Sequence, residues 1–307
     1  MTAHLRSRFA LVGLLVLLPV SAAAQGAGSS ASTVLRVPPG PRPLALGGAL
    51  VAVPDAFGAE YNPASLPGET TLAVAYQALP VGASAGAAAL ALPLGPVRLA
   101  FSARFLDYGE IEVIEERPDL PIGDPTGETA SGGELTTLLA AALRAGPLHV
   151  GIAGRWLRLD VADLSDDAFS GDAGVILEAV EDVRLGVSVQ NLGGEVRAGR
   201  AAPLPRTWRA GASVRRGIRG VRALATLESR HREDRTGLGA GLELAVGGQD
   251  LGGVARIGYE TRPEPGDAFA PFVFGAGVRV DRITVDFAYR ALGPLGSTRQ
   301  VGLGYTF

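Results

Sequence analysis

One group of side chains has the residue types of a nucleophilic catalytic site. Ser229 and His231 are followed closely by Glu233 and Asp234, and a serine, a histidine and an acid are what such a site requires. These residues stand in a run of charged residues, 230–235, which is more simply a solvated turn. The other histidine of the mature chain, His149, is expected at the opposite end of the predicted strands. We therefore predict that the protein is not an enzyme.

An acidic stretch between residues 160 and 172 offers oxygen ligands of the kind that calcium prefers. Its five aspartates lack the spacing of a known calcium loop, so we predict no metal and no cofactor, with calcium as the alternative. The sequence contains no cysteine, which excludes disulfides and thiolate metal sites.

Other charged residues alternate with apolar ones. Val183, Leu185 and Val187 alternate with Arg184 and Gly186, and a period of two indicates a β-strand with two different faces. If the apolar faces meet lipid, the charges point into a lumen, because a charge on the lipid face would cost about 2–4 kcal/mol at the midplane. We expect these charges to pair with one another or with a plug, and a polar path is the alternative. The predicted lumen-facing charges are Arg155, Arg184, Arg209, Glu228, Glu243, Arg256, Glu260, Arg279, Asp286 and Arg290.

Fourteen such alternating runs follow Gly68, and the connections between them are short and long in turn. A transmembrane barrel has this order, with short periplasmic turns and longer outer loops. We predict long connections at 108–132 and 161–169, among others. Six aromatic residues would then lie near the outer ends of their strands, where a membrane interface favours them: Tyr76, Phe105, Trp156, Trp208, Tyr259 and Tyr289. The runs are 69–78, 83–93, 96–107, 133–145, 148–160, 170–180, 182–190, 206–215, 219–231, 235–247, 252–262, 269–280, 282–290 and 298–307.

The last run carries Val301, Leu303, Tyr305 and Phe307 at every second position and ends on the terminal aromatic residue. A final strand that pairs with the first removes the open edge of a sheet. We therefore predict the closing strand of an outer-membrane barrel, recognised by the barrel-assembly machinery. The edge strand of a soluble sandwich is the alternative.

The amino terminus resembles a secretory signal in which a basic start precedes an apolar run, Phe9–Val20, and three alanines. We predict a cleaved signal peptide at 1–24, a flexible stretch at 25–35 and a barrel at 69–307. After cleavage, 26 basic residues face 31 acidic ones, which does not favour nucleic acid. The expected partner is outer-membrane lipid.

Residues 36–68 form an irregular, turn-rich segment. Asp55 could cap a short helix over 56–60, which Asn62 before Pro63 would end. A barrel of 14 strands is too wide for its own side chains to fill, since about eight strands already leave a side-chain-sized interior. We therefore predict that residues 36–68 form a plug in the lumen.

Several stretches resemble the PorV/PorQ family of FadL-like outer-membrane barrels, although Tyr61 stands where that family often has tryptophan. The resemblance implies a 14-stranded barrel with an amino-terminal hatch, to which Gly47, Gly48, Asp55, Asn62, Pro63 and Ala64 would belong. The stretches that carry the resemblance are 41–49, 53–56, 61–66, 187–194, 204–206, 241–243, 256–259, 275–278, 286–289 and 295–298.

Two functions follow from this resemblance. FadL relatives pass hydrophobic molecules through the barrel by hatch rearrangement and lateral exit, which implies a conduit for hydrophobic or amphipathic small molecules. PorV relatives serve type IX secretion and escort cargo, which implies secretion-system proteins as partners. We favour the conduit, because this chain has modest outer loops compared with the secretion-linked members.

Overall fold

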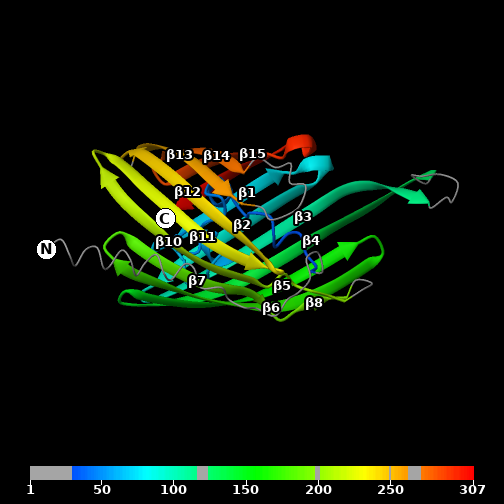
Figure 1. The fold of residues 1–307 in the computed structure, drawn as a ribbon, viewed down its shortest axis with the longest axis horizontal. Coiled ribbons are helices and arrows are strands. Elements are labelled where there is room, and N and C mark those ends of the chain that lie inside the picture. Colours follow the sequence, from blue (N-terminus) through cyan, green and yellow to red (C-terminus); the bar gives the residue numbers. More distant parts are fainter. Residues whose placement is uncertain (1–29, 116–123, 198–200, 249, 262–270) are drawn as a thin grey trace.

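The computed structural model describes residues 30–115, 124–197, 201–248, 250–261 and 271–307 (Figure 1). Fourteen antiparallel strands form a closed barrel in which the last strand, β16, pairs with the first, β1. The prediction of one all-β barrel of 14 strands is confirmed. The predicted signal peptide, residues 1–24, lies outside the described residues. Within them, no helix has the length and apolar character needed to cross a membrane.

Among the residues described, four short helical turns and a small second sheet accompany the barrel. They are α2 (Pro41–Ala45), η1 (Gly58–Glu60), η2 (Pro80–Gly82), η3 (Gly293–Leu295) and the pair β8 (Glu195–Val196) and β9 (Ala202–Pro203). The barrel strands are β1 (Thr71–Ala78), β2 (Ser84–Leu94), β3 (Val97–Glu115), β4 (Asp124–Ala145), β5 (Leu148–Val161), β6 (Leu164–Val180), β7 (Val183–Leu192), β10 (Thr207–Ile218), β11 (Val221–Arg232), β12 (Arg235–Gly247), β13 (Leu251–Glu260), β14 (Phe272–Val280), β15 (Ile283–Ala291) and β16 (Ser297–Thr306).

Alternation along each strand separates an apolar outer face from a polar inner one. In β16, Val301 and Leu303 are each 50% exposed, whereas Thr298 and Gln300 are buried inside. The pairing of β16 with β1 sets Tyr76 opposite Val301 and Gln77 opposite Gln300, so the same alternation continues across the closure. The seam between the two ends of the sheet therefore has the same two faces as the rest of the wall.

The two rims of the barrel differ in their connections. The rim near the carboxyl terminus has tight turns, such as Gly95–Pro96 and Glu181–Asp182; we call it the tight-turn end. The predicted long connections at the other rim are wrong in two places. β3 and β4 continue through most of 108–132 as a hairpin that projects beyond the barrel (Figure 1), and only Ala162 and Asp163 separate β5 from β6. The β4 side of the β3–β4 hairpin lacks apolar alternation, whereas on the β3 side Ile111 and Val113 alternate with Glu110 and Glu112, a pattern that by itself indicates a strand.

The segment before β1 lies inside the ring of strands. Its contacts reach strands on every side: α2 packs on β13 to β16, Glu60 hydrogen-bonds to β3 and β5, the Val51 amide to β11, and Asn62 to β6 and β7. The predicted helix over 56–60 is only the single turn η1, and Asp55 Oδ1 accepts the amide of Phe57 just before it.

Residues 31–34 belong to the stretch that composition predicts to be flexible, yet they make defined contacts. Glu134 of β4 accepts hydrogen bonds from the Ser32 hydroxyl and the Thr33 and Val34 amides, at 2.5, 2.7 and 3.3 Å. Val34 is buried in an apolar cluster with Leu106, Leu157 and Leu204. The Glu134 carboxylate, together with the Ala31–Pro203 and Arg104–Val34 hydrogen bonds, thus holds a stretch whose own composition predicts no structure.

Inward-facing glycines of the wall allow this close approach. A Cβ on Gly151 or Gly186 would overlap the backbone of Pro63 or of Val51, and one on Gly174 would overlap the Asn62 side chain. Glycine weakens an isolated strand, but it is suited to a position where a second backbone passes close by. These glycines therefore mark where the amino-terminal segment touches the wall.

We expect Gly174→Ala to lower the free energy of unfolding by about 1–3 kcal/mol, because the added methyl overpacks against Asn62. Gly154→Ala on the neighbouring strand is the matched control, since nothing lies within 4 Å of its Cβ position. Denaturant unfolding of both variants in the same detergent measures the difference. Equal stabilities would contradict the close contact.

Candidate functional site

The candidate site is the contact between the amino-terminal segment, residues 41–66, and the inner wall. At one side of the ring, Asn62 Nδ2 donates to the carbonyls of Val51, Val175 and Val187 at 2.8, 3.2 and 3.4 Å. Its Oδ1 accepts the amide of Ala64 at 2.9 Å. Asn62 and Ala64 are buried, and Pro63 lies between them against the wall glycines. This predicted hatch motif therefore fixes the segment against β6 and β7.

Glu60 carries the deepest charge of the segment. Its carboxylate accepts hydrogen bonds from Ser102, from Arg104 at 3.1 Å and from Arg155 at 3.0 Å, and Arg155 also reaches Asp172 at 3.3 Å. Burial by itself would raise the pKa of Glu60, but the positive charges of Arg155 and Arg104 and the Ser102 hydroxyl outweigh it and lower the pKa to about 2. Glu60 therefore stays ionised while buried, between two cations of the wall. We call this group the Glu60 clasp.

A second contact lies on β10 and β11. Glu228 accepts the Val51 amide at 2.8 Å and pairs with Arg209, whose guanidinium also lies 4.8 Å from the centre of the Tyr61 ring. Here the wall supplies the carboxylate and the segment supplies a backbone donor and an aromatic face. Both predicted lumen charges, Arg209 and Glu228, thus point inward and bind the segment.

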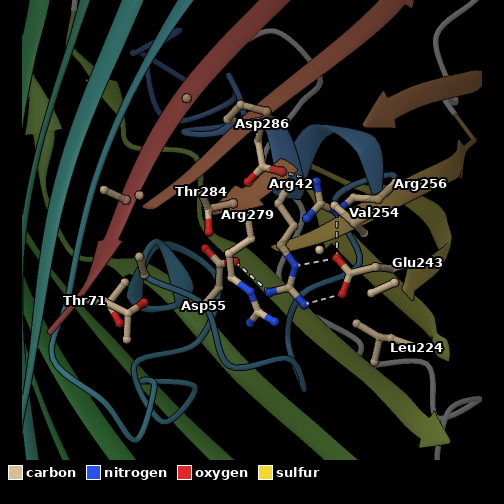
Figure 2. A pocket seen from close by; sticks show the side chains of 18 of the residues that line it. Arg42, Asp55, Thr71, Leu224, Glu243, Val254, Arg256, Arg279, Thr284 and Asp286 are labelled. Atoms are coloured by element: carbon tan, nitrogen blue, oxygen red, sulfur yellow. Dashed lines mark hydrogen bonds and ion pairs between the residues drawn. The ribbon is translucent and has the colours of Figure 1, made fainter. Parts of the chain in front are cut away.

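A third contact involves Arg42 of α2 (Figure 2). Arg42 pairs with Asp55 of its own segment at 2.8 Å and with Glu243 of β12 at 2.7 Å. Glu243 also accepts Arg256 at 2.6 Å, and Arg256 reaches Asp286 at 2.6 Å. The chain of charges therefore runs from the segment across β12, β13 and β15.

The remaining predicted lumen charges pair within the wall or face open space. Arg184 pairs with Glu178 at 3.0 Å, and Arg290 pairs with Glu260 at 2.5 Å, beside Arg230. Arg279 donates to the carbonyl of Gly248 at 2.8 Å. These contacts do not involve the amino-terminal segment.

Gly47 and Gly48 follow α2 with positive φ angles of 63° and 72°, which side chains rarely adopt. A Cβ on Gly47 would also overlap the carbonyl of Tyr259 in the wall. Glycine is therefore required at this turn both for its backbone conformation and for its closeness to β13.

Catalytic chemistry gains no support from the geometry. His231 Nδ1 lies 3.0 Å from Thr236 Oγ1, and Glu233 pairs with Arg36 of the segment. Within the described ranges, Ser229 and His231 share no hydrogen bond, and no group of three or more metal-ligating side chains gathers.

Two cavities open at the tight-turn end, on either side of residues 53–55. One, of about 410 Å³, is lined by Arg42, Asp55 and Phe57 and by strands β10 to β16 and β1. The other, of about 620 Å³, is lined by Val53, Pro54, the β4–β5 turn and strands β4, β6, β7, β10 and β11. The opposite rim is occupied by the apolar cluster around Val34. The lumen is thus packed at one end and hollow at the other.

Sequence reasoning missed Glu60, Arg104, Arg215 and Arg222. A charged residue within an otherwise apolar segment is a signal for buried pairing, and Glu60 carries that signal. Extending the period of two from Arg209 to Arg215, and from Glu228 back to Arg222, would have placed both arginines on the inner face.

Comparisons with known proteins place this architecture. No family model matches the chain, and no curated protein matches it. A mutant of the TodX monoaromatic hydrocarbon channel superposes with a TM-score of 0.63 at 11% identity, covering 87% of this chain and 98% of that one. The toluene transporter TodX of P. putida gives 0.55 at 12% identity, covering 91% and 99%. A Pseudomonas aeruginosa FadL homologue gives 0.51 at 11%, covering 85% and 93%.

The class defined by the fold is therefore a closed 14-stranded antiparallel barrel that is similar in fold to these structures. At such low identity the likeness concerns the fold alone. None of the three is described as a PorV or PorQ protein, so that resemblance, with its link to type IX secretion, stays a prediction.

We expect Glu60→Gln to lower the free energy of unfolding by about 3–5 kcal/mol, because it leaves Arg104 and Arg155 buried without their shared carboxylate. Glu195→Gln is the control, because its pair with Arg197 is exposed and contributes at most about 1 kcal/mol. Denaturant unfolding measures both losses. A loss no larger for Glu60→Gln than for the control would contradict the clasp.

The clasp also predicts a pH dependence. Because the pKa of Glu60 falls from 4.5 to about 2 on folding, its contribution is complete above pH 4.5 and is lost as the pH falls towards 2. The stability difference between wild type and Glu60→Gln should therefore shrink by about 3 kcal/mol between pH 5 and pH 2. Unfolding measured across this range tests it, and a difference that does not change with pH would contradict it.

Proposed function

We propose that this protein is an outer-membrane barrel that conducts hydrophobic or amphipathic small molecules, with residues 36–68 as a hatch in its lumen. The observation that carries the proposal is a lumen occupied by a segment that side-chain contacts hold in place. The segment adds no strand to the barrel sheet. Moving it would therefore break its contacts at Glu60, Val51 and Arg42 but none of the strand pairings of the wall.

The outer surface supports a membrane location. Large apolar side chains project from the outer face of every barrel strand, and Tyr76, Phe105, Tyr259 and Tyr289 are exposed among them. An apolar band with aromatic residues near its edge is the surface that a lipid bilayer requires of a barrel.

The arrangement of the lumen supports an apolar or amphipathic cargo. Towards the rim opposite the tight-turn end, Val34, Leu106, Leu157 and Leu204 form a buried apolar cluster, beside the hydrogen bonds of Glu134 to residues 32–34. This cluster supplies apolar surface that suits an apolar or amphipathic solute. The fold likeness to structures described as a monoaromatic hydrocarbon channel and a toluene transporter agrees with this cargo class. The secretion alternative draws on the sequence resemblance alone.

The test is uptake into vesicles whose outer leaflet contains lipopolysaccharide, because that leaflet slows passive entry of apolar solutes. We expect wild-type protein to raise toluene uptake several-fold over empty vesicles while leaving sucrose excluded. A variant that lacks residues 36–68 should admit sucrose as well, because the bore of a 14-stranded barrel is then open.

Arg158→Gln serves as the control variant, because this exposed residue pairs with Asp160 and Asp167 near the β5–β6 turn, away from the segment. It should behave as wild type. Equal toluene uptake by empty and protein-containing vesicles would contradict the proposed conduit. Sucrose exclusion by the deletion variant would contradict the proposed hatch.

A further inference from the structure

The 410 Å³ cavity at the tight-turn end holds more positive charge than its own carboxylates can neutralise. Five arginines and three carboxylates line it. Arg42 and Arg256 account for all three carboxylates, because they pair with Asp55, Glu243 and Asp286. The arginines that remain are Arg215, Arg222 and Arg279.

These three arginines have no acidic partner in the part of the chain that the structure describes. Arg215 and Arg222 form no ion pair there, and Arg279 donates only to the carbonyl of Gly248. Arg215 also lines the neighbouring 620 Å³ cavity, so it stands where the two cavities meet.

All three arginines lie on the inner face close to a tight turn: Arg215 near the end of β10, Arg222 at the start of β11 and Arg279 at the end of β14. Arg215 lies opposite Leu224, and Arg222 is two residues from Leu224 on the same inner face. Arg279 lies opposite Thr284, whose side chain faces the same space in Figure 2. Guanidinium groups present several donors in a plane and match the geometry of a carboxylate.

Apart from three threonines, Thr71, Thr284 and Thr306, the rest of the lining is apolar or glycine. Phe57, Leu224 and Val254 face the cavity, together with Pro41 and Pro43 of the segment. A volume of this size falls within the range of about 300–1,000 Å³ found for small-molecule sites. Inorganic anions would leave this apolar surface uncovered, whereas an organic acid would satisfy both parts of the lining.

We propose that this cavity binds a small organic monocarboxylate, with its carboxylate on Arg222 and Arg279 and its apolar body against Phe57, Leu224 and Val254. The role of this site in transport rests on the proposed function. In that conduit, the cavity is the last binding position at the tight-turn end and favours anionic amphiphiles over neutral ones. The binding itself requires only the cavity.

Benzoate is the probe, because it carries one carboxylate on a small apolar ring. Benzyl alcohol is the neutral match, and inorganic phosphate is an anion without an apolar body. Calorimetric titration of purified full-length protein in detergent at low salt should show benzoate binding about tenfold or more tightly than either, since a hydrogen bond to a charged group contributes that much.

The double variant Arg222→Gln/Arg279→Gln should lose about tenfold or more of the benzoate affinity, whereas Arg158→Gln, far from the cavity, should keep it. Unchanged benzoate affinity in the double variant would overturn the proposal. So would phosphate or benzyl alcohol binding as tightly as benzoate to the wild type.

The vesicle assay separates this proposal from the conduit. Arginine-dependent benzoate binding without toluene uptake would leave the site standing and remove the conduit. Toluene uptake without arginine-dependent benzoate binding would do the reverse.

Discussion

A buried charge is stable only beside a partner of opposite sign, and the packing of this lumen depends on that constraint. Arg104 and Arg155 of the wall meet Glu60 of the segment, while Glu243 of the wall meets Arg42. Glu60 and Arg104 thus pair across the contact, whereas Arg155, Glu243 and Arg42 pair across it and also have a partner on their own side. Removing one partner of such a pair costs more than the pair contributes, because the remaining charge stays desolvated. Wall and segment are consequently interdependent, although the segment adds no strand to the barrel.

The glycines of the wall make this charge pairing possible at short range. Ion pairs and backbone contacts between the segment and the sheet need the two chains to come close, and Gly151, Gly174 and Gly186 leave the room. A wall of larger side chains would hold the segment away. The ion pairs between segment and wall would then have longer distances and be more exposed to water. The abundance of glycine in this sequence, 43 residues, therefore has a packing reason at these inner positions as well as a conformational one at the turns.

The two ends of the lumen provide different surroundings for a solute. The rim at Val34 carries a packed apolar cluster, whereas the tight-turn end is hollow and carries arginines that pair with no carboxylate in the described part of the chain. The Glu60 clasp lies between them. In the proposed conduit, a molecule that moves from one end to the other would pass from an apolar setting to a cationic one. This difference between the two ends of the lumen arises from the segment and the wall together, because the barrel strands alone would leave the bore open.

The sequence by itself determined the barrel, because a period of two is a local property of each strand. Val301, Leu303, Tyr305 and Phe307 mark an apolar face without reference to any other part of the chain, and 14 such runs predict 14 strands. The outer part of β4 lacks this signal, and in the outer part of β3 it extends only over Ile111 and Val113, so most of this hairpin could not be predicted from the period of two. Only the tertiary structure decided the partners of the charges, because Glu60 and Arg155, or Arg42 and Glu243, lie far apart in the chain and meet through closure of the ring. Which arginines remain without a carboxylate is likewise settled by three-dimensional packing, since composition counts charges but does not pair them.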